Sequence, residues 1–219
     1  FGLAKDVLDE MPSVQHFIWS DDMAGEAAPD GRFKDFNAWI SPYPDTEPEA
    51  VLRIEDPCQM TYTSGTESLP KGVITSNQAL IAQYMGCIID GGFDPGDVSV
   101  NALPIYHCAQ RDVFMNPIFW LGGTNVLITP EVGKILQSIE EHRATMFFAP
   151  PTVWIGMLRH PDFTKRDLST LKKCYYGASI MPREILSEML DRLPGAKFYN
   201  FYGQTELAPY HTILKAKEI

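Results

Sequence analysis

Residues 62–75 read Tyr-Thr-Ser-Gly-Thr-Glu-Ser-Leu-Pro-Lys-Gly-Val-Ile-Thr, the most informative stretch of this sequence. The apolar run 58–62 predicts a strand that enters a loop, and Val73-Ile74 predicts a strand that leaves it. Hydroxyl groups and a glycine backbone offer hydrogen-bond donors, and Lys71 adds a positive charge, so the loop is suited to phosphate. The order Pro70-Lys71-Gly72 differs from a Walker A loop, in which lysine follows glycine and precedes serine or threonine. An ordinary hydroxyl-rich surface turn is the alternative.

Strand-like and helix-like patterns alternate downstream of this loop. Strands are predicted over residues 98–103, 125–129, 145–149, 171–176 and 197–201, and helices over 77–90, 112–121, 132–142, 150–159 and 182–192. Upstream, a strand over 13–19 and a helix over 33–40 precede a proline- and acid-rich connecting segment, 41–57. This alternation predicts an α/β fold with a mostly parallel sheet flanked by helices. We expect residues 1–219 to form one partial domain.

Composition narrows the range of functions. The 219 residues carry 28 acidic and 18 basic side chains, and this net charge of −10 argues against a broad nucleic-acid-binding surface. The four cysteines show neither close pairs nor metal-type spacing, so a reduced, cytoplasmic protein is expected. No apolar run reaches the length of a membrane helix, and the sequence leaves peripheral membrane contact and homo-oligomer formation open.

Four patterns occur in order along the chain, and the first of them lies in the loop described above. They are Thr63-Ser64-Gly65-Thr66 with Pro70-Lys71-Gly72, Pro104-Ile105-Tyr106-His107, Tyr176-Gly177-Ala178-Ser179 and Tyr202-Gly203-Gln204-Thr205-Glu206. Together they resemble the phosphate loop, the Pro-x-x-His segment, the adenine-binding turn and the Tyr-Gly-x-Thr-Glu motif of the adenylate-forming superfamily. That superfamily includes acyl-CoA synthetases, peptide-synthetase adenylation domains and firefly-type luciferases. The resemblance covers residues 50–219 closely, and it implies part of the large N-terminal domain of an acyl-CoA synthetase-like enzyme.

The resemblance assigns the first motif to ATP. Lys71 is expected to hold the β- and γ-phosphates as a mobile positive charge and to act in catalysis. The family commonly has Thr-Gly where this chain has Glu67-Ser68, so we expect the carboxylate of Glu67 to turn away from the polyphosphate. The other residues expected to contact the nucleotide here are Thr63, Ser64, Gly65, Thr66 and Gly72.

The last motif is expected to hold the reacting phosphate and a magnesium ion. Glu206 is the candidate ligand, because Mg²⁺ takes carboxylates together with phosphate oxygens. Thr205 is a candidate catalytic residue that offers its hydroxyl to the α-phosphate. Tyr202, followed by Gly203, presents an aromatic face to adenine. Taken alone, Glu206 would suit a helix N-terminus equally well.

Two further motifs are expected to border the ligands. Gly177, Ala178 and Ser179 follow a predicted strand, where small residues let a ligand approach the backbone. By resemblance, Ala178 and Ser179 contact adenine, and Gly177 also borders the acyl pocket. His107 is expected to lie in the substrate pocket as a wall or gate rather than as a proton-transfer group. A plain strand–helix turn and a satisfied wall histidine are the alternatives.

These expectations favour ATP-dependent activation of a carboxylic acid, with a fatty acid as first choice, to an acyl-adenylate and then to acyl-CoA. ATP, Mg²⁺ and coenzyme A are the cofactors implied. An aryl- or amino-acid-activating enzyme is the alternative, with Asp112 as an ambiguous amine anchor, and a nucleotide-binding module without catalysis is another. Six residues are candidate walls of an apolar pocket, although each also suits the core: Phe114, Trp120, Phe147, Phe148, Pro150 and Trp154.

Two expectations concern completeness and geometry. The resembling enzymes continue past this motif with a ribose-binding aspartate, a hinge and a small domain that carries a catalytic lysine, and this chain ends at Ile219 without them. We therefore expect the 219 residues alone to make no acyl-CoA. We also expect segments 63–71 and 202–206 to meet at neighbouring strand ends, because α/β sheets bind ligands there.

Overall fold

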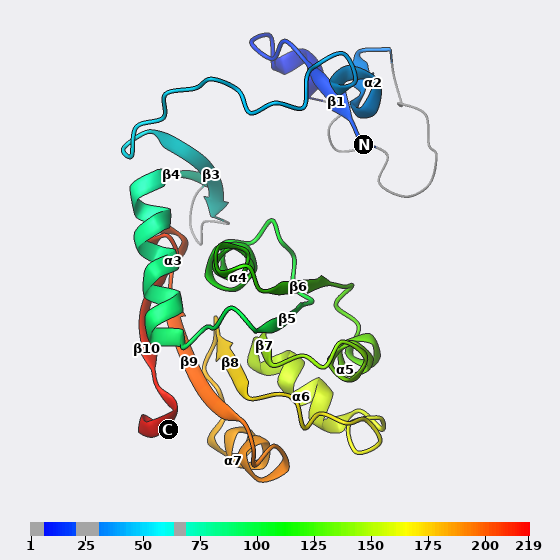
Figure 1. Cartoon of the computed structure of the whole chain (residues 1–219), viewed down its shortest axis with the longest axis vertical. Helices are drawn as coiled ribbons and strands as arrows, with labels where there is room; N and C mark the ends of the chain where they lie inside the picture. Colours follow the sequence, from blue (N-terminus) through cyan, green and yellow to red (C-terminus); the bar gives the residue numbers. More distant parts are fainter. Residues whose placement is uncertain (1–6, 21–30, 64–68) are drawn as a thin grey trace. The chain divides into compact units, whose positions relative to one another are not determined.

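A computed structural model describes residues 7–20, 31–63 and 69–219 of the chain (Figure 1). Contacts divide the chain into two compact units, Phe1–Val51 and Leu52–Ile219. The boundary between them falls within the proline- and acid-rich segment 41–57.

The first unit contains a small two-stranded sheet. Strand β1 (Phe17–Trp19) pairs in parallel with β2 (Phe33–Asp35), and a 3₁₀ helix, η1 (Leu8–Glu10), precedes them. The helix predicted over 33–40 is wrong in its first three residues, since those form β2 and helix α2 covers Phe36–Ile40. Asp35 sets this start because its side chain accepts a hydrogen bond from the backbone N–H of Ala38 at 2.8 Å.

The second unit is built on a six-stranded sheet with the order β10-β9-β8-β7-β5-β6 (Figure 1). Strands β5 to β9 run parallel, and β10 pairs antiparallel with β9. The α/β fold with a mostly parallel sheet is thus confirmed, whereas β10 was not foreseen. The strand bounds are Val98–Asn101 (β5), Thr124–Leu127 (β6), Met146–Ala149 (β7), Lys173–Gly177 (β8), Lys197–Gly203 (β9) and Tyr210–Leu214 (β10).

Helices provide the crossovers that parallel strands require. Helix α3 begins after Ser76, whose hydroxyl accepts from Ala79 N, and it ends at Gly92, which takes a left-handed φ of 69°. The segment predicted as one helix over 112–121 is instead a π-helix, η2 (Ala109–Met115), that continues into α4. The helix bounds are Asn77–Gly91 (α3), Asn116–Leu121 (α4), Val132–Glu141 (α5), Pro151–Arg159 (α6) and Arg183–Arg192 (α7).

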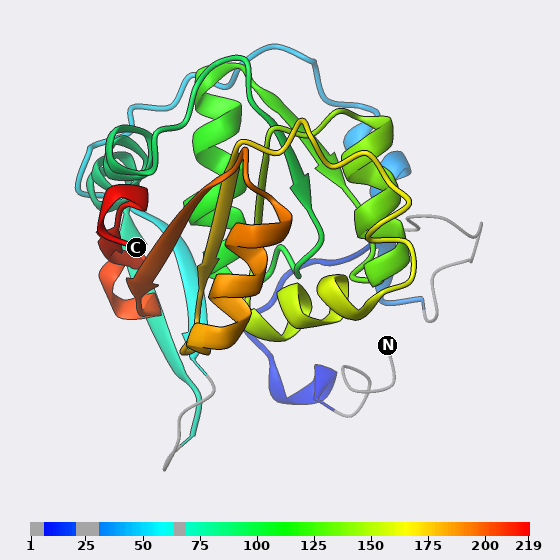
Figure 2. The same cartoon turned by 90° about the horizontal axis from the view of Figure 1, so that it is seen from below.

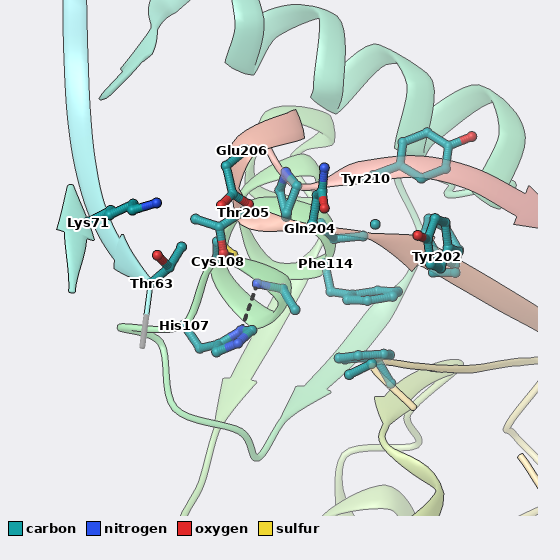
Figure 3. Close-up of a pocket in the computed structure, with 17 residues that line it drawn as sticks. Thr63, Lys71, His107, Cys108, Phe114, Tyr202, Gln204, Thr205, Glu206 and Tyr210 are labelled. Atoms are coloured by element: carbon teal, nitrogen blue, oxygen red, sulfur yellow. Dashed lines mark hydrogen bonds between the residues drawn. The ribbon is translucent and has the colours of Figure 1, made fainter. Parts of the chain in front are cut away.

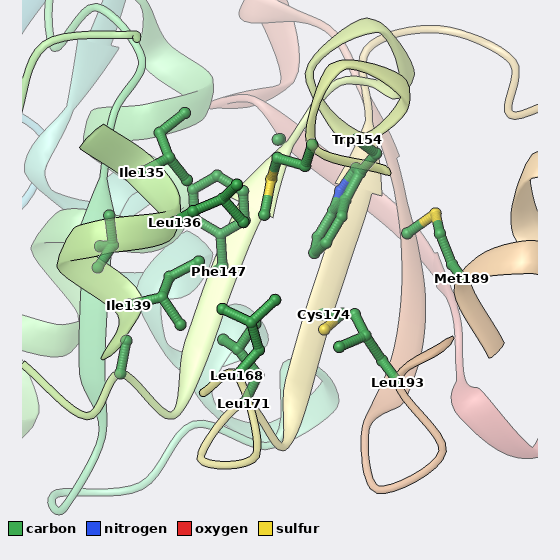
Figure 4. Packing of buried hydrophobic residues seen from close by; sticks show 14 of the residues in the cluster. Ile135, Leu136, Ile139, Phe147, Trp154, Leu168, Leu171, Cys174, Met189 and Leu193 are labelled. Atoms are coloured by element: carbon green, nitrogen blue, oxygen red, sulfur yellow. The ribbon is translucent and has the colours of Figure 1, made fainter. Parts of the chain in front are cut away.

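Alternation along the strands divides the apolar side chains between two faces of the sheet. Val100, Phe147, Cys174 and Phe198 lie side by side in register and join the larger core, which is covered by α5, α6 and α7 (Figures 2 and 4). Trp154 of α6 is fully buried there, and its indole N–H donates to the carbonyl of Tyr175 at 3.1 Å. Phe147 and Trp154 therefore belong to the core.

The opposite face carries a second, aromatic core. Phe148 and Tyr175, the next row of the sheet, pack with Phe114 of η2 and with residues of α3 and α4. The Tyr175 hydroxyl donates to the carbonyl of Gly91 at 2.7 Å, which ties the end of α3 to the centre of the sheet. Because neighbouring residues of β7 point to opposite faces, Phe148 is available to a site on this side and Phe147 is not.

Strands β3 (Pro57–Thr63) and β4 (Lys71–Ser76) form a separate antiparallel hairpin in which Thr63 pairs with Lys71. The expectation that segments 63–71 and 202–206 would occupy neighbouring strand ends of one sheet is wrong, because the hairpin is not part of the main sheet. Seven residues separate the two strands, too few for a parallel crossover, so an antiparallel turn is the available connection.

Two global features bear on the sequence predictions. All four cysteines are free in the structure. Across the described ranges 7–20, 31–63 and 69–219, no helix combines the length and the apolar character needed to cross a membrane.

A buried polar cluster ties together the starts of β5, β7 and β8. Lys173 lies 2.7 Å from Asp97 and 2.6 Å from Asp94, and the Thr145 hydroxyl donates to Asp97 at 2.7 Å. Burial opposes the charge on Lys173, but hydrogen bonds from its ammonium to the two aspartates raise its pKa overall. The Asp97 side chain is 5% exposed and that of Asp94 is 71% exposed. Asp97 also accepts hydrogen bonds from the Thr145 hydroxyl and from the backbone N–H of Asp94, so its ion pair is both more buried and more extensively hydrogen-bonded.

We predict unequal stability losses when these two aspartates are changed. Asp97→Asn should lower the free energy of unfolding by roughly 3 kcal/mol, because it breaks a buried ion pair. Asp94→Asn is the matched control and should cost less than about 1 kcal/mol, as expected for an exposed pair. Urea denaturation followed by circular dichroism measures both, and equal losses would contradict the prediction.

Candidate functional site

A cavity of about 890 Å³ lies beside the carboxyl ends of β8 and β9 in the second unit (Figure 3). The β3–β4 hairpin, the start of η2, and the turn after β9 contribute its walls. Segments that lie more than 100 residues apart in the sequence therefore share one space.

The hairpin supplies a cationic wall. Thr63 and Lys71 both line the cavity, and Figure 3 shows the Lys71 amine extending inward toward the side where Thr205 and Glu206 lie. Gly72 does not line the cavity; a Cβ there would lie 2.9 Å from the Met60 sulfur, so the glycine makes room for packing on the hairpin itself. The predicted contacts of Ser64, Gly65 and Thr66, like the orientation of Glu67, fall outside the described residues.

The turn after β9 supplies the hydroxyl and carboxylate. Thr205 and Glu206 begin a short 3₁₀ helix, η3 (Thr205–Leu207), and both line the cavity. The turn is closed by Gln204 N, which donates to the carbonyl of Pro209 at 2.9 Å. A side chain at position 203 would overlap that carbonyl oxygen, so the close return of the chain requires Gly203. Gly203 and Tyr202 also line the cavity.

Cys108 contacts the wall that carries Thr205, and the sequence reasoning missed it. Its sulfur lies 3.4 Å from the Thr205 hydroxyl, and both residues line the cavity. Burial raises the pKa of the Cys108 thiol, although the hydrogen bond with Thr205 opposes the rise. The thiol is therefore protonated at neutral pH and can orient the Thr205 hydroxyl, but it is a poor nucleophile. Its position directly after His107 was the available signal.

His107 lines the cavity, as the sequence predicts for a pocket residue. Its Nδ1 accepts a hydrogen bond from Ala109 N at 3.1 Å (Figure 3). Because a backbone N–H can only donate, Nδ1 carries no proton and the neutral ring carries its proton on Nε2. The histidine is thus fixed by the first turn of η2 and presents a donor.

The three residues of the predicted adenine-binding turn, Gly177, Ala178 and Ser179, differ in whether they line the cavity. Ala178 lines the cavity and adopts a left-handed φ of 64°, a conformation that brings backbone toward the ligand space at a cost in strain. Gly177 is buried behind it, and a Cβ there would overlap the carbonyl oxygen of Phe201 in the neighbouring strand. Gly177 and Ser179 are not among the residues that line the cavity.

The remaining wall is apolar and aromatic. The rings of Phe114 and Phe148 are stacked with centroids 4.1 Å apart and an interplanar angle of 12°. Phe201 and Val113 complete this wall, and Tyr210, also missed by the sequence reasoning, lies at its edge. Burial and the neighbouring Asp90 anion raise the pKa of Tyr210 to about 12, so its hydroxyl stays neutral.

The other candidate wall residues lie elsewhere. Trp120 is half exposed and packs edge-on against Tyr84, and Pro150 caps the start of α6. Asp112, the ambiguous amine anchor, does not line the cavity; its carboxylate is fully buried among Gln59, Arg111 and Asn116.

The donor set fits a magnesium ion that arrives with ATP. Over the residues the structure describes, Glu206 is the only carboxylate that lines the cavity, and no group of three or more His, Cys, Asp or Glu side chains could hold a metal ion. Magnesium commonly takes one or two carboxylates and completes its shell with phosphate oxygens and water. One carboxylate, Glu206, lies within the number that magnesium commonly takes.

Comparisons with known proteins agree with this geometry. The profile of the AMP-binding enzyme family matches residues 3–218. The feruloyl-CoA synthase of an Amycolatopsis species is 30% identical over 166 residues, which are 75% of this chain and 33% of that protein. The long-chain-fatty-acid–CoA ligase of Bacillus subtilis is 29% identical over 170 residues, 76% of this chain and 29% of that protein. The chain thus spans about a third of the length of these relatives.

Among solved structures, the anthranilate CoA ligase AuaEII in complex with anthranoyl-AMP superposes with a TM-score of 0.86. The superposition covers all of this chain and 42% of that one, at 22% sequence identity, and it supports the fold. The family match spans both units and includes all four sequence motifs. The chain belongs to the AMP-binding enzyme family, as its resemblance to adenylate-forming enzymes predicted.

Proposed function

We propose that the protein containing this chain activates a carboxylic acid with ATP and transfers the acyl group to coenzyme A. One observation carries the proposal: Lys71 and the Thr205–Glu206 pair, from distant segments, line one cavity whose remaining wall is aromatic. Such a space offers cationic and hydroxyl groups for phosphate beside an apolar surface for the acid. The relatives' names support the same reaction, since they are CoA synthases and ligases.

In the first step, a carboxylate oxygen of the acid attacks the α-phosphorus of ATP, and the bond to the β-phosphate breaks to release pyrophosphate. Lys71 and Thr63 bind the β- and γ-phosphates as they leave. Thr205, oriented by Cys108, donates its hydroxyl to an α-phosphate oxygen, where charge develops. In the second step, the sulfur of coenzyme A attacks the acyl carbon, AMP leaves, and the thiol proton is released.

Glu206 would hold the magnesium ion, which when bound neutralises charge on the phosphates. The chain's own residues do the rest at the nucleotide. Tyr202 stacks against adenine, and Ala178, in its left-handed conformation, brings its backbone to the ring edge. His107 donates from Nε2 toward the carboxylate end of the acid.

The acid has an apolar tail that packs on the stacked rings of Phe114 and Phe148. A fatty acid remains our first choice, and an aryl acid is the alternative, because relatives named for each kind are similar to this chain to the same degree. An amino acid is disfavoured, since the buried carboxylate of Asp112 is occupied by Gln59 and Arg111 and cannot also anchor an amine.

The test is acid-dependent exchange between ATP and pyrophosphate, followed by acyl-CoA formation when coenzyme A is added. The panel contains medium- and long-chain fatty acids, cinnamic-type acids and phenylalanine. Exchange with an apolar acid supports the proposal, and ATP binding without exchange for any acid would favour a non-catalytic nucleotide-binding module. The same assay on the 219 residues alone checks the prediction that they make no acyl-CoA.

Glu206→Gln should lower the exchange rate at least ~100-fold, the scale expected when a preorganised electrostatic group is lost. The amide keeps the shape of the side chain but removes the charge that attracts the cation, so higher magnesium should restore part of the rate. Binding of the acid should be unchanged. Glu184→Gln, at an exposed carboxylate in the first turn of α7, is the control. An unchanged rate and magnesium dependence would reduce Glu206 to a helix-start carboxylate.

Lys71→Ala should have a smaller effect, a fall of roughly tenfold with an increased KM for ATP, because other donors still hold the phosphates. The steady-state ATP dependence of exchange measures both quantities. Lys134→Ala, which removes an exposed lysine paired with Glu131, is the control. A decrease as large as that of Glu206→Gln would contradict the assigned difference between the two roles.

A further inference from the structure

A polar cluster outside the cavity links the β3–β4 hairpin to the π-helix η2. At its centre is Asp112, whose side chain is fully buried, next to Arg111, whose side chain is 27% exposed. The Arg111 guanidinium donates from Nε to one carboxylate oxygen at 2.9 Å and from Nη2 to the other at 3.0 Å. Asn116 contributes a longer bond of 3.4 Å.

Two bonds of this cluster cross to the hairpin. Gln59 of β3 donates from Nε2 to Asp112 at 2.9 Å, and the Nη2 of Arg111 donates to the Thr61 hydroxyl at 3.3 Å. Gln59, Thr61 and Thr63 are alternate residues of one strand, so they lie on the same face of the hairpin. The face that brings Thr63 to the cavity is therefore the face that Arg111 and Asp112 hold.

The same two residues lie in the middle of the segment that forms the opposite wall. Cys108 and Ala109 precede Arg111, Val113 and Phe114 follow Asp112, and all four of these line the cavity. Cys108 in turn contacts Thr205. The π-helix and the Cys108 residue that precedes it thus contact both segments that we assign to the phosphates, the hairpin with Lys71 and the turn with Thr205.

The energetics favour a positioning role over simple stabilisation. A buried ion pair gains little stability compared with apolar residues of similar volume, because desolvation of both charges offsets their attraction. Its hydrogen bonds are directional, however. A bidentate guanidinium and a carboxylate that accepts at both oxygens fix the orientation of the groups bonded to them. Here the fixed partners are on a two-stranded hairpin that is not part of the main sheet and needs another anchor.

We propose that Arg111 and Asp112 are positioning residues that hold the phosphate-binding hairpin at its working distance from the rest of the cavity. The proposal rests on the function proposed above. Loosening this anchor weakens binding of the polyphosphate of ATP, because only the β- and γ-phosphates contact Thr63 and Lys71. Binding of AMP, which uses Thr205, Tyr202 and Ala178, is retained.

The test removes the two hairpin bonds while keeping the buried ion pair. Gln59→Leu with Thr61→Val should raise the dissociation constant for Mg·ATP by ~10-fold or more, as expected for the loss of hydrogen bonds to charged groups. The dissociation constant for AMP should change by less than about twofold. Titration calorimetry on the intact protein that contains this chain measures both. Gln59→Leu with Thr61→Ser keeps the hydroxyl that accepts from Arg111 and should restore part of the affinity.

Gln78→Leu makes the same chemical change at an exposed glutamine near the start of α3 and should leave both constants unchanged. Amide hydrogen exchange provides a second measurement that does not depend on nucleotide. In the double variant, exchange in β3 and β4 should increase while exchange in β7 and β8 stays the same. Chemical denaturation verifies that the double variant is folded.

Several results would overturn the positioning role. These are an unchanged affinity for Mg·ATP in the double variant, equal weakening of Mg·ATP and AMP, or unchanged hairpin exchange. An intact wild-type protein that binds neither nucleotide would overturn the proposed function and this inference with it. Normal wild-type binding with an unaffected double variant would overturn this inference alone. Asp112→Asn is not the primary variant, because it removes the fully buried charge of the ion pair, leaves the partly exposed Arg111 guanidinium without its partner and risks unfolding.

Discussion

The parallel pairing of β7, β8 and β9 is the constraint on which the rest of the site depends. Parallel strands end at the same edge, and this pairing brings Gly177 and the turn after Gly203 together although a whole helix separates them in the chain. The approach is close: side chains at these two positions would overlap the carbonyl oxygens of Phe201 and Pro209. The backbone at the strand ends can therefore form the floor of a ligand cavity.

The other half of the cavity is built differently. It consists of the β3–β4 hairpin and the π-helix, which lie outside the main sheet. Polar contacts fix these two elements to each other, and they involve Gln59, Thr61, Arg111 and Asp112. A π-helix is uncommon in proteins and is frequent at functional sites. In this chain it faces the hairpin with Arg111 and Asp112 and faces the cavity with Val113 and Phe114. The π-helix therefore holds the phosphate-binding hairpin and also forms part of the apolar wall of the cavity.

The division of aromatic residues follows from strand geometry. Phe147 and Phe148 are adjacent in sequence but point to opposite faces of β7, so one packs on Trp154 in the core and the other stacks on Phe114 at the cavity. Composition could not separate them, because both are apolar residues in a buried strand. The pairing of Phe147 with Cys174 and of Phe148 with Tyr175 in β8 places Phe147 on the core face and Phe148 on the cavity face.

The sequence by itself determined the alternation of strands and helices, the parallel sheet, the family, and the motif residues Lys71, His107 and Thr205, because these are encoded by local periodicity and short patterns. Only the tertiary structure decided that β3 and β4 form a separate hairpin, that β10 adds an antiparallel strand at one edge of the sheet, and that residues 109–115 form a π-helix. It also places Cys108 and Tyr210 in the lining of the cavity and Asp112 in a buried ion pair with Arg111. These outcomes depend on contacts between residues far apart in the chain, which no local pattern contains.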